Sequence, residues 1–269
     1  MKLYKYQGAG NDFLLIDGRD GSVHVDTDVI SSLCDRRYGI GADGLMVLGP
    51  AAEGYDFRME YYNSDGSGGM MCGNGGRCIV SFAQDVAYPG KKSFSFIAPD
   101  GPHTGEVLLE EGKSKIVRIS IKNVDTIESL PEHEYFLDTG TRHFVRFVGN
   151  LAGYDVVTEG RTARHDPRFA PVGVNANFVE IAPDGTAISV RTFEKGVEDE
   201  TYACGTGITA SAIATYVETG LGKKSGDGRI SFGVHALKDE LAVDFVPENG
   251  VMKDVHLTGP ATYVAAIEV

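Results

Sequence analysis

The amino-acid sequence predicts an α+β protein of two pseudo-symmetric domains, each a mostly antiparallel, barrel-like sheet wrapped round a central helix. The first observation is a cysteine followed by small residues and then a helix-compatible apolar run, which occurs at Cys72 and again at Cys204. The second is that short, alternating strands precede both cysteines in the same order. A repeat of about half the chain is too long for a solenoid unit and too few in number for a propeller. Internal duplication of one domain therefore fits best.

The first half is predicted to consist of short strands separated by turn-forming residues, with two helices. Alternating or apolar strand patterns lie at 3–6, 13–17, 45–48, 56–62, 93–97, 106–109 and 115–121. Helical spacing occurs at 27–34, with Thr27 or Asp28 as the expected N-cap, and in the apolar run 79–88. Residues 39–44 fit a dinucleotide-binding pattern but precede a strand instead of opening a helix. A nucleotide site is therefore not predicted there.

The second half repeats this order of elements. Strand patterns lie at 135–137, 140–148, 174–181, 187–193, 229–232, 241–245, 254–257 and 263–269, and a helix is expected at 208–217. The polar stretch 123–134 carries Pro131 and is expected to connect the halves. We therefore expect an N-terminal domain at 1–125 that contains Cys72 and a C-terminal domain at 126–259 that contains Cys204.

The bulk properties exclude several classes of protein. The 269 residues include 25 Lys and Arg against 38 Asp and Glu, and the net charge of −13 disfavours nucleic acid or an anionic membrane surface as a partner. The first residues lack the apolar core of a secretion signal, and no apolar run approaches membrane-spanning length. A cytoplasmic protein with reduced thiols is expected, since four cysteines without a signal do not suggest a disulfide framework.

The cysteines divide into two pairs by context. Cys34 lies in an apolar helical stripe and Cys78 lies more than one turn into a helix, so both are expected to fill the core. Cys72 and Cys204 are each expected at a helix start, where unpaired N–H groups and the helix dipole favour a thiolate. The spacing of the four cysteines does not match a zinc motif, so no metal is predicted. A cysteine hydrolase would need one nucleophile and a His base, which leaves the second matching cysteine unexplained.

Two equivalent thiols suit the inversion of a carbon stereocentre, because one proton must leave from one face and another must arrive on the opposite face. A thiolate and a thiol can do this symmetrically. The backbone N–H groups of Gly73 and Asn74, and of Gly205 and Thr206, could stabilise the carbanion delocalised into a carboxylate. The residues alone thus predict racemisation or epimerisation of a small amino acid or related acid, without a cofactor.

Four motifs in order along the chain make the prediction more specific. They are Gly8-Ala9-Gly10-Asn11-Asp12-Phe13, Asn63-Ser64-Asp65-Gly66, the run from Cys72 to Cys78, and Cys204-Gly205-Thr206-Gly207. Together they closely resemble diaminopimelate epimerase. The resemblance implies interconversion of LL- and meso-diaminopimelate in lysine and peptidoglycan precursor synthesis. It also implies a last strand at 260–269 that returns to the first domain, and a homodimer.

The resemblance assigns roles to individual residues. Cys72 and Cys204 match the acid–base pair, and His143 and Glu194 match residues that support catalysis beside them. The predicted substrate-binding residues are Asn11, Asn63, Gly73, Asn74, Thr141, Asn175, Lys195, Gly205 and Thr206. Among these, the asparagines at 11, 63 and 175 match ligands of the distal, non-reacting end of the substrate.

The chain departs from the family pattern at several positions. Thr141 and Arg142 stand where the family usually has asparagine and proline, and Gly44 stands where glutamine is common. Lys195 replaces the usual arginine, so a bidentate grip on a carboxylate becomes a point charge. We hypothesise that Arg142 or backbone groups compensate. Two alternatives stay open: a related two-thiol racemase of proline or hydroxyproline, and a catalytically silent ligand-binding protein.

Overall fold

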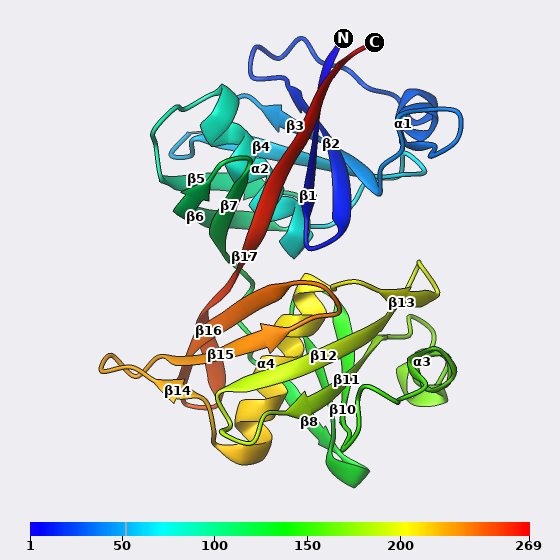
Figure 1. The fold of residues 1–269 in the computed structure, drawn as a ribbon, viewed down its shortest axis with the longest axis vertical. Coiled ribbons are helices and arrows are strands. Elements are labelled where there is room, and N and C mark those ends of the chain that lie inside the picture. Colours follow the sequence, from blue (N-terminus) through cyan, green and yellow to red (C-terminus); the bar gives the residue numbers. More distant parts are fainter. Residues whose placement is uncertain (52) are drawn as a thin grey trace. The chain divides into compact units, whose positions relative to one another are not determined.

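The computed structural model describes residues 1–51 and 53–269 of the chain. These residues form two compact units. Unit 1 contains Met1–Ile119 and Gly259–Val269, and unit 2 contains Ser120–Thr258. The first stretch of unit 1 thus ends at Ile119, whereas the sequence analysis placed the domain boundary at residue 125. The last strand, β17 (Val251–Glu268), drawn in red in Figure 1, contributes residues to both units.

Unit 1 is a closed ring of strands. Its strands are β1 (Lys2–Gly8), β2 (Asn11–Asp17), β3 (Gly44–Gly49), β4 (Phe57–Asn63), β5 (Ser93–Ala98), β6 (Gly101–Glu111) and β7 (Ser114–Ser120). Each strand pairs with the next, and the C-terminal part of β17 closes the ring by pairing with both β7 and β1. Helix α1 (Thr27–Cys34) connects β2 to β3, and helix α2 (Gly73–Val86) follows β4.

Unit 2 has the same plan. Its strands are β8 (Ile127–Leu130), β9 (Glu134–Asp138), β10 (Arg142–Phe147), β11 (Asn175–Ile181), β12 (Ala187–Glu194), β13 (Asp199–Thr201), β14 (Lys223–Lys224), β15 (Ile230–His235) and β16 (Glu240–Glu248). Helix α3 (Val156–Arg164) connects β10 to β11, and helix α4 (Gly205–Thr219) follows β13. Two short 3-10 helices lie at Pro131–His133 and Pro167–Phe169.

The strand pairings confirm the predicted fold class and the duplication. In unit 1 the pairs β1–β2, β2–β3, β3–β4, β4–β5 and β5–β6 are antiparallel, parallel, antiparallel, parallel and antiparallel. In unit 2 the pairs β9–β10, β10–β11, β11–β12, β12–β15 and β15–β16 follow the same series. The register equates Phe13 with His143 and Gly44 with Asn175, because these residues form the first parallel pair of each unit.

The central helices α2 and α4 are buried on nearly all sides. In α2 every residue from Gly73 to Gln84 is buried, and in α4 every residue from Gly205 to Thr215. A helix that is enclosed all round must satisfy its polar side chains internally. In α4 the hydroxyls of Thr209, Ser211 and Thr215 do so by donating to carbonyl oxygens four residues earlier, at 2.8 to 3.0 Å. None of the helices within residues 1–51 and 53–269 is long and apolar enough to cross a membrane.

Several predicted elements differ from the observed ones. Helix α3 was not predicted, although Asp155 caps it by accepting from the backbone N–H of Thr158. The N-cap of α1 is Asp26, one residue before the predicted positions, because its carboxylate accepts from the N–H of Val29. The segments 254–257 and 263–269 are parts of one long strand, β17, and β8 lies within the predicted connecting stretch.

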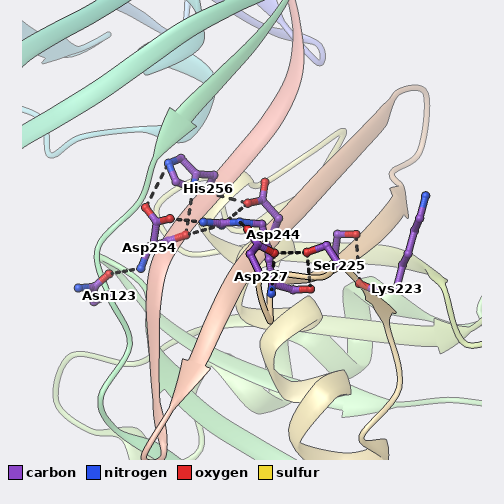
Figure 2. A network of polar contacts seen from close by, with 9 residues as sticks. Asn123, Lys223, Ser225, Asp227, Asp244, Asp254 and His256 are labelled. Atoms are coloured by element: carbon purple, nitrogen blue, oxygen red, sulfur yellow. Dashed lines mark hydrogen bonds and ion pairs between the residues drawn. The ribbon is translucent and has the colours of Figure 1, made fainter.

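A polar cluster, shown in Figure 2, joins the strands of unit 2 near the start of β17. The guanidinium of Arg229 forms ion pairs with Asp244 of β16 and with Asp254 of β17. The backbone N–H of Asp254 donates to the Oδ1 of Asn123 at 3.0 Å, and the ring of His256 lies 3.6 Å from both aspartates. The cluster therefore ties β16 and β17 to the segment that precedes β8.

Candidate active site

Cys72 and Cys204 occupy the predicted positions at the starts of the two buried helices. Cys72 is the N-cap of α2 and Cys204 the N-cap of α4, both with extended backbone and without a capping side-chain hydrogen bond. The N–H groups of a first helical turn have no partner inside the helix. Each thiol thus lies beside backbone donors and the positive end of a helix dipole, which favours a thiolate and a bound carboxylate.

The start of α2 is held in place by residues of unit 1. The buried Arg77 side chain donates to the carbonyl oxygens of Pro260 and Gly73, at 3.1 and 3.3 Å, and to the Asn74 Oδ1 at 3.0 Å. A side chain at Gly8 would place its Cβ 3.1 Å from the Asn74 carbonyl oxygen. Glycine at position 8 therefore lets β1 approach the helix start closely.

The predicted ligands of unit 1 lie at one end of its ring, where β2 and β3 begin and β4 ends. Asn11 is the first residue of β2, and its Oδ1 is buried without a hydrogen-bond partner. Asn63 is the last residue of β4, pairs with Gly44, and donates from Nδ2 to the Ser67 hydroxyl at 3.0 Å. A buried, unpartnered acceptor is costly unless a ligand supplies a donor.

In unit 2 a chain of hydrogen bonds leads from Cys204 to a buried histidine. The Cys204 Sγ lies 3.6 Å from the Thr206 Oγ1, which lies 3.1 Å from the Thr141 Oγ1. The Thr141 Oγ1 in turn lies 2.9 Å from the Nε2 of His143. The His143 Nδ1 lies 3.2 Å from the Nδ2 of Asn177. The structure therefore links three predicted site residues, His143, Thr141 and Thr206, in series to the thiol of Cys204.

The direction of this chain follows from its chemistry. The Asn177 Nδ2 also donates to the Phe144 carbonyl oxygen at 2.9 Å, and its Oδ1 accepts from the Thr192 hydroxyl at 2.9 Å, which sets the amide orientation. An amide nitrogen only donates, so the Nδ1 of His143 accepts and its proton sits on Nε2. Burial lowers the pKa of His143 to about 3, so the ring is neutral at pH 7. The His143 Nε2–H can then donate to Thr141, the Thr141 hydroxyl to Thr206, and the Thr206 hydroxyl to the sulfur of Cys204.

Asn175 holds the surrounding loops. Its Nδ2 donates to the Arg142 carbonyl oxygen at 3.2 Å and to the Thr141 Oγ1 at 3.4 Å. Its Oδ1 accepts from the backbone N–H of Lys195 at 2.9 Å. The side chain of Lys195 is exposed, and the Glu194 carboxylate accepts from the Thr201 hydroxyl at 2.8 Å. Asn175 thus fixes the position of Thr141 and of the Lys195 backbone.

The guanidinium of Arg142 is engaged away from these residues. It donates to the Phe169 carbonyl oxygen at 3.2 Å and lies 5.0 Å from the centre of the Phe136 ring. Because strand side chains alternate, Arg142 and the adjacent His143 face opposite sides of β10. The structure therefore offers no support for compensation by the Arg142 side chain, whereas the backbone of Arg142 and of Lys195 lies against Asn175.

The two remaining cysteines are packed in unit 1, as expected. Cys34 and Cys78 are both buried, and burial raises the pKa of the thiol to about 11 for Cys34 and about 12 for Cys78. Both thiols are therefore protonated at neutral pH. Neither is suited to proton abstraction.

Three inward-facing residues were not singled out from the sequence: Asn177, Thr192 and Tyr61. Asn177 lies two residues after Asn175 on β11, and Thr192 lies two residues before Glu194 on β12. Strand periodicity places them on the same faces as the predicted residues. The signal that could have found all three is a polar or aromatic residue two positions from a predicted ligand, since Tyr61 likewise precedes Asn63 by two.

The fold is shared with several solved structures. A phenazine biosynthesis protein of the PhzF family from Bacillus anthracis has a TM-score of 0.74 at 14% identity, covering 100% of this chain and 98% of that chain. A hydroxyproline epimerase from Agrobacterium vitis, solved with bound trans-4-hydroxy-L-proline, has a TM-score of 0.69 at 15% identity, covering 100% and 90%. At these identities the likeness concerns the fold alone.

Sequence relatives are closer. A diaminopimelate epimerase from Flavobacterium psychrophilum is 44% identical over 266 residues, which are 98% of both chains. One from Chlorobaculum tepidum is 42% identical over 263 residues, which are 96% of both. The profile of the family described as diaminopimelate epimerase matches residues 3–121 and 135–264. The duplicated fold and these relatives define an isomerase of the epimerase class. The chain belongs to the diaminopimelate epimerase family.

Proposed function

We propose that the protein interconverts LL- and meso-diaminopimelate by proton transfer at the α-carbon, with Cys72 and Cys204 as the two acid–base groups. The observation that carries this proposal is the matched placement of the two cysteines. Each is the N-cap of a buried helix, in corresponding positions of two pseudo-symmetric units. Family membership supports the substrate, because the relatives at 42% to 44% identity are named for it.

The reaction balances without an additional reagent. One thiolate takes the α-proton and becomes a thiol, and the C–H electron pair is delocalised into the α-carboxylate. The other cysteine, present as a thiol, gives its proton to the opposite face of the carbon and becomes a thiolate. The two sulfurs have then exchanged protonation states, and the reverse direction starts from that form. This scheme needs no electron-sink cofactor.

The helix starts serve the charge that develops on the substrate carboxylate. The first N–H groups of α2, at Gly73 and Asn74, and of α4, at Gly205 and Thr206, are the proposed donors. Donors that are fixed in place before the reaction stabilise such charge without a cost of reorganisation. Arg77 contributes indirectly, since its hydrogen bonds to Gly73 and Asn74 hold the first turn of α2.

The hydrogen-bond chain of unit 2 is proposed to stabilise the thiolate of Cys204. The proton on the His143 Nε2 points to Thr141, whose hydroxyl can donate to Thr206, whose hydroxyl can donate to the sulfur. Hydrogen bonds to the charged form of an acid lower its pKa. A neutral His143 is suited to this role, because it donates without adding a charge that would compete with substrate.

The distal amino-acid end is proposed to bind Asn11, Asn63, Asn175 and the loop that contains Glu194 and Lys195. The unpartnered Oδ1 of Asn11 supports this assignment for unit 1. In unit 2 the side chain of Lys195 is exposed and thus available as a point charge for a carboxylate. We further propose that the protein acts in the cytoplasm as a homodimer and supplies lysine and peptidoglycan precursor synthesis.

One experiment tests the reaction against both alternatives. The protein is incubated in D₂O with LL-diaminopimelate, and α-deuterium and the meso product are measured by NMR and chiral chromatography. The proposal expects both. Exchange with proline or hydroxyproline but not with diaminopimelate would favour the related racemase. An absence of exchange with all three would favour a silent ligand-binding protein.

A further inference from the structure

Tyr61 lies on the inward face of β4, between the core and the predicted ligand Asn63. Strand alternation places Met59, Tyr61 and Asn63 on one face. Met59 is 1% exposed, and its Cε would lie 3.6 Å from a Cβ at Gly75 of α2. This face of β4 therefore faces the central helix, and Tyr61 lies on it between the buried Met59 and Asn63 at the end of the strand.

The ring of Tyr61 occupies a slot that a glycine leaves open. A Cβ at Gly69 would lie 2.2 Å from the Tyr61 Cδ1, so any side chain there would displace the ring. On the inward side, the ring meets Phe13 edge to face, with centroids 6.0 Å apart and planes at 77°. The Tyr61 side chain is thus held in one orientation by its neighbours.

This orientation brings the hydroxyl to the level of Asn63. The Tyr61 Oη would lie 3.3 Å from a Cβ at Gly44, and Gly44 pairs with Asn63 on β4. In unit 2 the residue that corresponds to Gly44 is Asn175, which carries an amide. Tyr61 therefore supplies a polar group where position 44 itself has no side chain.

A second polar group lies at this end of unit 1. The Oδ1 of Asn11 is buried without a hydrogen-bond partner, and Asn11 shares the inward face of β2 with Phe13, the residue against which Tyr61 packs. An acceptor in this state suits an ammonium group, and a phenol hydroxyl can donate to a carboxylate. A free amino-acid group offers both.

We propose that the Tyr61 hydroxyl binds the distal, non-reacting amino-acid group of the substrate, together with Asn11 and Asn63, and thereby contributes to substrate specificity. This inference rests on the proposed function, and it adds a residue that motif matching does not assign. Failure of this inference is distinguishable from failure of the proposed function, because in the first case the wild-type protein would still epimerise diaminopimelate.

The test compares Tyr61→Phe with the wild type on two substrates. Removal of one hydrogen bond to a charged group is expected to raise KM for LL-diaminopimelate about 10- to 100-fold, with kcat changed less than about 3-fold. For 2-aminoheptanoate, which lacks the distal amino and carboxyl groups, α-deuterium exchange by the two proteins is expected to be equal. An unchanged KM for diaminopimelate, or an equal loss on both substrates, would overturn the proposal.

Two further variants separate substrate contact from packing. Tyr62→Phe is the matched control, because the Tyr62 hydroxyl donates to Glu60 and its side chain faces the opposite side of β4. Its KM is expected to stay at the wild-type value. Gly69→Ala should displace the ring and raise KM like Tyr61→Phe, and it should add no further loss in a Tyr61→Ala background. A full additional loss in the double variant would show that Gly69 does not act through Tyr61.

Discussion

The inward faces of units 1 and 2 share one backbone plan but differ in chemistry. At the corresponding positions of the second and third strands, unit 1 has Phe13, Gly44 and Met46 where unit 2 has His143, Asn175 and Asn177. Tyr61 and Thr192 also correspond, since they pair with Met46 and Asn177. At these positions the inward face of unit 1 is apolar and aromatic. The inward face of unit 2 is polar there, and its side chains form hydrogen bonds with one another.

The comparison shows which features of the duplicated domain are required for the shared role and which are free to diverge. Both units keep a cysteine N-cap and a glycine at the third helical position. Side chains at these glycines would meet Met46 at 3.2 Å in unit 1 and Asn177 at 2.2 Å in unit 2. The close contact between strand and helix start is therefore common to both, while its chemistry is not.

The largest expected effect tests whether the two thiols are equivalent despite these different inward faces. Cys72→Ala and Cys204→Ala should each lower kcat about 10³-fold or more, because each removes one of two obligatory proton-transfer groups. The measurement is the initial rate of meso product and of α-deuterium incorporation. Cys34→Ala is the control and should keep activity within about 2-fold. Retention of full epimerisation by either of the first two variants would contradict the two-thiol scheme.

The next effect tests the hydrogen-bond chain that is found in unit 2. Thr141→Val should lower kcat/KM about 10-fold and move the rising limb of the pH profile of kcat/KM to higher pH. The reason is that the Cys204 thiolate loses the hydrogen-bond chain that stabilises it, so that its pKa rises. Thr141→Ser keeps a hydroxyl and should recover most of the loss. Thr162→Val changes an exposed threonine of α3 and should have no effect. A pH profile of Thr141→Val that coincides with that of the wild type would show that the hydrogen-bond chain does not stabilise the thiolate.

A smaller effect concerns the closure of each ring of strands. In unit 1, β17 closes the ring by pairing with β7 and β1. In unit 2, the polar cluster of Figure 2 helps to hold β17 against the segment that precedes β8. Arg229→Ala removes the guanidinium that pairs with Asp244, whose side chain is 14% exposed, and leaves the ring of His256 3.6 Å from that carboxylate. We expect a loss of about 1–2 kcal/mol in the free energy of unfolding. Lys253→Ala removes an exposed pair between Lys253 of β17 and Glu248 of β16 and should cost at most about 0.5 kcal/mol. Equal losses in urea denaturation would show that the cluster has no special role.

The last effect, seen only in the dependence of stability on pH, concerns the ion-pair network that anchors the start of β2 in unit 1. Burial opposes ionisation of Asp12, but hydrogen bonds from Arg36 and Lys5 outweigh it and lower its pKa to about 2. This contribution to stability is complete above the unfolded-state pKa of about 3.9 and disappears as the pH falls through about 2. Asp12→Asn should therefore flatten the fall in stability between about pH 4 and about pH 2.

The exposed Asp125 of unit 2 provides the control for that measurement, and Asp125→Asn should retain the wild-type dependence of stability on pH. If Asp12→Asn and the wild type lose stability in parallel as the pH falls, the network does not stabilise unit 1.

Much of the fold could be predicted because its signals are local. The strands alternate in burial as their sequences alternate in polarity, and the cysteine–glycine runs mark the starts of α2 and α4. Helix α3 was missed because its sequence is polar and short, so that its burial against β11 and β12 comes from tertiary packing. The continuity of β17 was missed for a similar reason, since its pairing partners lie in two separate units.

The sequence by itself determined the duplication, the two helix-capping cysteines and the family motifs, because each depends on neighbouring residues or on repeated order. Only the tertiary structure decided which side chains act together. The chain from Cys204 to His143 joins α4 to β10, and the slot that holds Tyr61 depends on Gly44 and Gly69. Hydrogen-bond direction and space for a ring depend on atoms that the fold brings together from distant parts of the chain, so no local pattern could specify them.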